Sequence, residues 1–188
     1  MRLLAAVALA LLACGPAVAK DFDLGYARSG MMLGQFRFAA WPAGLTVRCS
    51  DDPDRPKDVD RLIGLPRQMA ELGAVRCALL TEDKGKIVPA TRKIGGTPVE
   101  MSAMFGPDPQ GTKRLVQLFL QGPRSGFDGL VTHLTSRLGK PVETDERLVR
   151  WAEPGWEAVV HEDGDTALAM IVDRPMQDAM NRRMANRR

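Results

Sequence analysis

Three cysteines and an apolar leader constrain this chain more than any other feature. Residues 1–19 contain Arg2, an apolar run and a closing Ala-Val-Ala, the pattern of a cleaved export signal. Cleavage after Ala19 removes Cys14, whereas a lipoprotein signal ending at Cys14 keeps that cysteine and lipidates it. Both interpretations leave Cys49 and Cys77 as an even pair in an oxidising compartment. The sequence therefore predicts an exported bacterial protein with a Cys49–Cys77 disulfide.

The two interpretations of the leader predict different locations. Small residues before the polar Lys20 favour cleavage and a soluble periplasmic protein, and the alternative is a protein lipid-anchored through Cys14. The apolar run is shorter than the roughly 20 residues of a membrane-spanning helix. No later stretch of the chain approaches that length. We therefore expect no transmembrane segment.

Composition indicates an ordinary globular domain and disfavours nucleic-acid binding. Hydrophobic residues make up 45% of the chain and charged residues 26%, as in typical folded proteins. The formal net charge is only +3 and aromatic residues make up 5% of the chain. The chain therefore lacks both the broad basic surface that binds phosphates and the aromatic side chains on which bases stack. We expect a signal segment over 1–19 and a single domain over 20–188. In an alternative division, residues 20–85 form a sub-lobe that carries the disulfide.

Alternating apolar residues predict strands around both cysteines. Each cysteine ends a Val-Arg-Cys triplet, in the segments 45–50 and 75–79, and shares the parity of its apolar neighbours. Both thiols should therefore point into the core. Neighbouring strands would bring the two Cα atoms within the range of about 4.4–6.8 Å that a disulfide requires.

The remaining pattern predicts an α+β fold, an antiparallel sheet with helices packed on one face. The best helix covers 127–138, where apolar residues form one stripe after a capping-box-like Ser125 and Asp128 and before Gly139. Residues 20–44 show no clear pattern. Further strands are expected at 98–105, 113–121, 148–151, 156–162 and 166–173, and further helices at 58–65, 66–72 and 175–186.

The strand over 113–121 suggests a binding surface. Val116, Leu118 and Leu120 are predicted to share one face, which leaves the opposite face to the residues between them. Large or polar residues on an uncovered sheet face are free to meet a partner. The candidate surface residues are Gln117, Phe119 and Gln121 of this strand, together with the tryptophans Trp151 and Trp156.

Two features suggest metal handling, and each has a structural explanation. Met176, Met180 and Met184 recur at helical spacing and could bind Cu(I), but a docking helix needs the same apolar stripe. An acidic loop could bind Ca²⁺, although it lacks the EF-hand pattern and contains Arg55 and Lys57. The acids are Asp51, Asp52, Asp54, Asp58 and Asp60, of which Asp58 is also expected to cap a helix. No metal and no cofactor is predicted.

Nothing in the sequence identifies an enzyme. No nucleophile elbow, zinc-protease, dinucleotide, phosphate-loop or Cys-x-x-Cys pattern occurs. His133 is expected on the solvent flank of its helix, and His161 at a sheet end beside an Asp-Gly turn. A hydrolase would need a pocket that gathers one of these histidines with a serine or a carboxylate.

The chain ends in a basic segment that suits the negative pole of a helix or an anionic surface. Its cations are Arg182, Arg183, Arg187 and Arg188. We therefore expect a periplasmic binding or interaction module without catalytic activity, whose partner is a protein or a cell-envelope component. The alternatives are a metal-handling protein and a hydrolase of unknown type.

Overall fold

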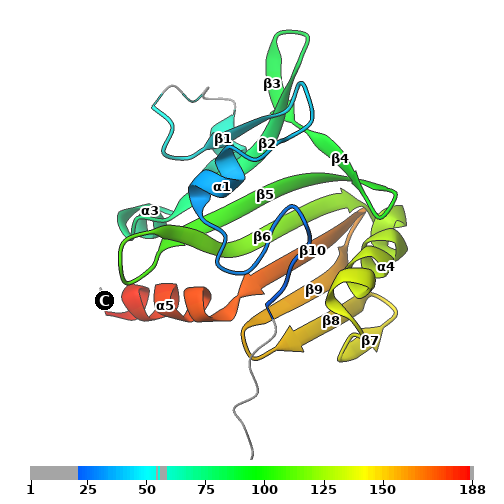
Figure 1. Cartoon of the computed structure of the whole chain (residues 1–188). Helices are drawn as coiled ribbons and strands as arrows, with labels where there is room; N and C mark the ends of the chain where they lie inside the picture. Colours follow the sequence, from blue (N-terminus) through cyan, green and yellow to red (C-terminus); the bar gives the residue numbers. More distant parts are fainter. Residues whose placement is uncertain (1–20, 54, 56–58, 187–188) are drawn as a thin grey trace, which may run out of the picture.

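The computed structural model describes residues 21–53, 55 and 59–186 (Figure 1). The helices are α1 (Leu33–Arg37), α2 (Asp60–Ile63), α3 (Arg67–Glu71), α4 (Phe127–Leu138) and α5 (Arg174–Ala185), and a short 3₁₀ helix over Arg124–Gly126 precedes α4. The strands are β1 (Thr46–Cys49), β2 (Val75–Asp83), β3 (Lys86–Pro89), β4 (Thr91–Ile94), β5 (Thr97–Pro107), β6 (Lys113–Pro123), β7 (Glu143–Asp145), β8 (Leu148–Glu153), β9 (Trp156–Asp163) and β10 (Thr166–Asp173). The predicted leader and Cys14 lie outside the described residues.

The described strands form one antiparallel sheet, as the α+β prediction requires (Figure 1). Its order is β1-β2-β5-β6-β10-β9-β8-β7, and β3 and β4 pair at the side with β2 and β5. The long hairpin of β5 and β6 forms the centre of this order. The meander of β8, β9 and β10 follows the turn chemistry that the sequence predicts. None of the helices in the described ranges has the length and apolar character needed to cross a membrane.

The strands diverge at one corner of the sheet. The edge of β5 that faces away from β6 pairs with β4 up to Glu100 and with β2 from Ser102 onwards. After Ala78, β2 turns away from β5 and pairs with β3, beginning at Leu80. The β2–β3 hairpin therefore leaves the plane of the sheet at the point where β4 joins it (Figure 1). Sequence analysis predicted neither β3 nor β4.

The first face of the sheet, defined as the one that carries Cys77, holds the main hydrophobic core. Residues of the N-terminal segment, including Phe22 and Phe36, pack onto it. The apolar stripe of α4, represented by Leu130 and Leu134, packs into the same cluster. The described part of the segment without a clear pattern, residues 21–44, thus covers the first face through separate apolar side chains, and it does not form one long element.

The second face, which carries Ala78, is covered by helices only in part. Ala78 and Leu80 of β2 pack with Ile63 of α2. Near the other end of β5, a further cluster contains residues of α3, α5 and the loop after α3. Its buried members are Leu72, Ala74, Met104, Val116, Met176 and Met180. Helices therefore pack on both faces of the sheet, and the expectation that they would share one face was wrong.

A β-bulge explains why Val116 lies on the second face. The register between β5 and β6 shifts at Met104 and Phe105, so that Phe105 pairs with Leu115 while Met104 pairs with Gln117. The extra residue, Val116, packs with α5, whereas Leu118 and Leu120 belong to the main core. The prediction that Val116 shares a face with Leu118 and Leu120 was wrong, because simple alternation assumes an unbroken ladder.

Helix α4 has the bounds that its apolar stripe predicts, but its start is built differently. No side chain caps its N-terminus, and the helix continues from the 3₁₀ turn, so the capping interaction expected of Ser125 and Asp128 is not formed. Gly139, with φ of +90°, ends the helix as predicted. A Cβ on Gly95 would lie 2.2 Å from the carbonyl oxygen of Gly129. Helix α4 is therefore held tightly against the β4–β5 turn.

The predicted disulfide is confirmed. Cys49 and Cys77 are direct partners across β1 and β2, fully buried, with Cα atoms 4.0 Å apart. The main-chain N–H of Ser50 donates to the carbonyl of Arg76 at 2.8 Å, so the cysteines occupy a non-hydrogen-bonded position of the ladder. Partners at such positions lie closest together, which is why the Cα distance falls just below the predicted range.

Candidate functional site

The sequence-predicted surface residues separate into two groups. Gln117, Phe119 and Gln121 lie on the second face of β6, in line with the prediction that they avoid the main core. Trp151 and Trp156 are 1% and 2% exposed and belong to the core, so neither indole forms part of a binding surface. Both tryptophans alternate in step with the buried apolar residues of their strands. This alternation indicates burial more strongly than the residue type indicates exposure.

Of the three β6 residues, only two lie in an open hollow. The side-chain amide of Gln117 donates to that of Gln177 in α5 at 2.6 Å, so the last helix covers this end of the face. Phe119 is half-buried and Gln121 is exposed, and both line a groove of about 280 Å³. The candidate functional site is therefore narrower than the predicted surface.

The groove lies at the corner where the β2–β3 hairpin leaves the sheet. It is bounded by residues of β2, β3, β5, β6 and β10, and by Leu62 of α2. Apolar walls come from Ala78, Pro89, Phe119 and Leu168, and polar groups from Arg76, Glu100, Ser102 and Gln121. A second hollow along β5, β6 and β10 shares Glu100 and Gln121 with it. The two hollows therefore adjoin each other on the second face.

Arg76 and Glu100 are the two charged groups of the groove, and neither forms an ion pair among the described residues. The guanidinium carbon of Arg76 lies 5.8 Å from the centroid of the Phe119 ring, a stacking contact that orients the cation. One terminal nitrogen donates weakly to the carbonyl of Gly64 at 3.4 Å, and Nε is buried without a partner. Partial burial lowers the pKa of Arg76, yet an arginine stays charged at every physiological pH. Among the described residues, no carboxylate pairs with it.

Beyond the groove, the second face continues as a half-buried sheet surface. Phe119 pairs with Met170, and Met170 pairs with Val159, so these side chains form a row across β6, β10 and β9. All three are partly exposed. At the far edge, Arg150 forms ion pairs with Glu143 and Glu157, and Arg174 also pairs with Glu157. The groove therefore opens onto an apolar row that ends in a neutralised charge cluster.

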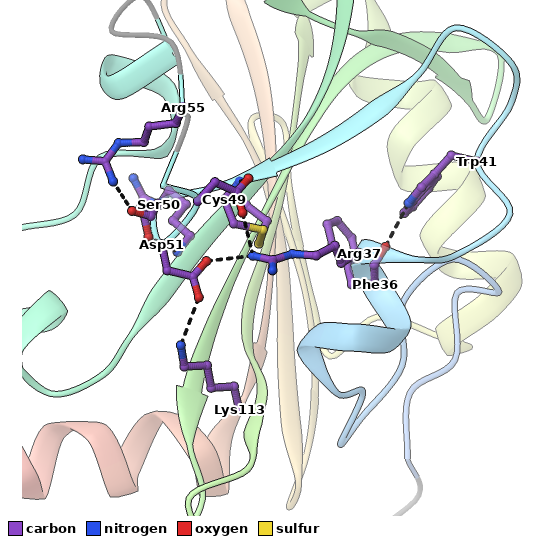
Figure 2. Close-up of a disulfide and its surroundings, with 11 residues drawn as sticks. Phe36, Arg37, Trp41, Cys49, Ser50, Asp51, Arg55 and Lys113 are labelled. Atoms are coloured by element: carbon purple, nitrogen blue, oxygen red, sulfur yellow. Dashed lines mark hydrogen bonds and ion pairs between the residues drawn. A yellow bond between two sulfur atoms is a disulfide. The ribbon is translucent and has the colours of Figure 1, made fainter.

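The acidic loop after Cys49 is satisfied by cations of the chain itself (Figure 2). Asp51 pairs with Arg37 at 2.7 Å and with Lys113 at 3.1 Å, and Asp52 pairs with Arg37 at 3.0 Å. Partial burial opposes ionisation of Asp51, but Lys113 and Arg37 outweigh it and hold its pKa below the usual value. Asp60 pairs with Arg55, whereas Asp54, Lys57 and Asp58 lie outside the described residues.

These contacts argue against the calcium interpretation. The oxygen atoms of Asp51 and Asp52 lie near the sulfur of Cys49 in the spacing of a metal group, but this sulfur is bound in the disulfide. Two cations already occupy the carboxylates that a Ca²⁺ ion would need. We interpret this loop as an ion-paired clamp between α1, β6 and the turn after Cys49.

The methionine stripe of α5 packs against the sheet. Met176 and Met180 are buried with Leu72 and Val116, and Met184 lies at the edge of the same cluster. A copper site needs thioether sulfurs with open coordination positions, and the buried pair does not offer them. These contacts support the packing interpretation of the stripe. At the end of α5, Arg183 donates to the carbonyls of Pro107 and Asp108, Arg182 is exposed, and Arg187 and Arg188 are not described.

In the described part of the chain, neither imidazole forms a hydrogen bond or an ion pair with a serine, a cysteine or a carboxylate. His133 is half-buried, not on the solvent flank, and its Nε2 lies 3.5 Å from the hydroxyl of Tyr26. His161 lies on the second face of β9, between Leu148 and Leu168 of the neighbouring strands. These surroundings give no support to the hydrolase alternative.

Sequence reasoning missed Arg76, the central cation of the groove. The parity of the Val-Arg-Cys triplet already places Arg76 on the face opposite Val75 and Cys77, which could have identified it. No signal showed that the hairpin would bend away beside it. No family model, curated protein or solved structure matches this chain.

Proposed function

We propose that this chain is an exported binding module without catalytic activity, and that its groove holds a segment of a partner protein. The observation that carries the proposal is the open groove around Arg76, Phe119 and Gln121, where an unpaired cation adjoins apolar walls. Binding sites are commonly concave and apolar with a few oriented polar groups. The disulfide supports an oxidising location.

The groove chemistry specifies the kind of segment that fits. Phe119 and Leu168 would bury an apolar side chain, and Arg76 would pair with a carboxylate beside it. Ser102 and Gln121 offer a hydroxyl and an amide for main-chain hydrogen bonds. The partner segment therefore combines an apolar residue with an acid at Arg76, and this acid would lie away from Glu100, which is four residues along β5 from Met104, the strand partner of Arg76. Capture of a non-protein envelope component at the same groove is the alternative that the experiment below separates.

We predict that Arg76→Gln and Phe119→Ala each weaken partner binding at least about tenfold, because central aromatic and arginine anchors dominate interface energies. The measurement is a pull-down from envelope extract, followed by titration of the purified partner at two salt concentrations. Phe38→Ala is the matched control, because Phe38 is 83% exposed on a different part of the surface.

The salt dependence provides a second readout. Binding to Phe119→Ala should still weaken with salt, while binding to Arg76→Gln should depend on salt less than the unaltered protein does. The proposal is contradicted if Phe38→Ala abolishes capture while Phe119→Ala retains it. If the groove captures a lipid or a polysaccharide and no protein, the partner is a non-protein component of the envelope.

We further propose that the mature protein begins at Lys20 and is soluble in the periplasm. Small residues before this position suit a signal peptidase. The intact mass of protein isolated from the envelope fraction tests the prediction, and it should match residues 20–188 with two hydrogens fewer for the disulfide. A mass that includes an acylated Cys14 would instead establish the lipid-anchored alternative.

A further inference from the structure

A cluster of two arginines, a tyrosine and a histidine lies on the first-face side of the sheet, away from the groove. Arg92 of β4 pairs with Val99, whose side chain belongs to the main core, so Arg92 shares that face. Tyr26 comes from the N-terminal segment, and His133 and Arg137 come from α4. Residues far apart in sequence thus meet where α4 packs beside β4.

Two aromatic rings hold the Arg92 guanidinium. Its central carbon lies 5.3 Å from the centroid of Tyr26 and 5.6 Å from that of Trp41. Such contacts fix the plane of a guanidinium while leaving its N–H groups free to donate at their edges. Within the described part of the chain, neither Arg92 nor Arg137 forms an ion pair. The orientation of Arg92 is therefore set in advance without a carboxylate.

Tyr26 and His133 form the rigid centre of the cluster. Their rings are nearly parallel, with centroids 6.1 Å apart, and the Tyr26 hydroxyl is 3.5 Å from Nε2 of His133. A Cβ on Gly95 would lie 2.8 Å from Cβ of His133, so the turn before β5 confines the histidine as well. Arg137 follows His133 by one helical turn and is exposed on the same side of α4.

The electrostatics of the cluster are one-sided. Burial raises the pKa of Tyr26, so its hydroxyl remains a hydrogen-bond donor at neutral pH. Partial burial, followed by the charges of Arg137 and Arg92, lowers the pKa of His133. Both arginines therefore lie close enough to act on both rings. Among the residues that the structure describes, no carboxylate pairs with either arginine, which makes an anion the missing partner.

We propose that Tyr26, Arg92, His133 and Arg137 form a binding site for a phosphate group. Two guanidinium groups can each donate in a bidentate manner to the oxygens of a tetrahedral anion, and the imidazole can supply a further N–H. A dianion would also draw a proton onto His133, since the bound charge offsets the two arginines. The site is separate from the groove and does not depend on the proposed function.

The test is a titration of His133 by NMR on the disulfide-intact mature chain, with phosphate or chloride at equal ionic strength. We expect inorganic phosphate to raise the pKa of His133 and to bind about tenfold more weakly to Arg137→Gln. Arg182→Gln is the matched control, because Arg182 is exposed on α5 and lies outside the cluster. An unchanged His133 titration in phosphate, or equal losses in both variants, would overturn the proposal.

Two further arms identify the source of the phosphate group. Glycerol phosphate represents a soluble phosphomonoester, and vesicles of phosphatidylcholine with or without phosphatidic acid represent a lipid. Arg137-dependent binding to glycerol phosphate alone assigns a soluble ligand, and Arg137-dependent binding to acidic vesicles assigns a headgroup. Vesicle binding that Arg137→Gln and Arg182→Gln weaken equally is general charge attraction and contradicts the site.

Discussion

Replacing both Cys49 and Cys77 by alanine will lower the free energy of unfolding by about 3–4 kcal/mol. The bridge closes a segment with a sequence separation of 28 residues, and closing a loop of this length restricts the unfolded chain by that amount in the chain-entropy model. It also joins the edge strand β1 to β2 at a fully buried position. A protein of this size should lose roughly 10 °C in its melting temperature.

Urea unfolding of the oxidised, the reduced and the doubly substituted protein measures this effect. Reduction and substitution should shift the midpoint to a similar extent, because both remove the same constraint from the unfolded chain. A midpoint that neither change moves would show that the bridge contributes nothing to stability. The slope of the transition should rise after reduction, because the unfolded chain then exposes more surface.

Trp151→Ala will cost about 3–5 kcal/mol of unfolding free energy, the range for large aromatic side chains removed from a core. Trp151 is among the largest fully buried side chains, and its indole N–H donates to the carbonyl of Gly139 at 3.0 Å. The ring therefore ties β8 to the end of α4. Removing it leaves both a cavity and an acceptor without its donor.

Thermal and urea unfolding of Trp151→Ala and Phe38→Ala together provide the comparison. Phe38 is exposed, so its replacement should change stability by less than about 0.5 kcal/mol. Trp151→Phe should fall between the two, because it restores most of the volume and loses the hydrogen bond. If Trp151→Ala lowered the free energy of unfolding as little as Phe38→Ala, the indole would lie on the surface, as the sequence analysis expected.

Local sequence patterns predicted the elements in which neighbouring residues all favour the same secondary structure. The stripe of α4, the β8–β10 meander and the pairing of Cys49 with Cys77 all follow from parity and turn chemistry. The strands β3 and β4 were missed because each has only four residues and little alternation, and their pairing depends on β2 and β5. Long-range contacts, not local preference, determine them.

The candidate site was predictable only in part for the same reason. Phe119 and Gln121 follow from alternation along β6, and both line the groove. Gln117 is covered because α5 returns across β6, a tertiary contact that alternation cannot anticipate. The groove itself exists because β2 leaves β5 after Ala78, so no single segment carries its signal.

The central claim is that the groove beside Gln121 is where this protein meets its partner. Photo-crosslinking in living cells tests it most directly, with a photoreactive amino acid at Gln121 or, as a control, at Val142, which is 58% exposed elsewhere. We expect a discrete protein adduct from position 121 that is lost when Arg76→Gln is added, and none from position 142. Equal adducts from both positions, or an adduct at 121 that Arg76→Gln leaves unchanged, would contradict the claim.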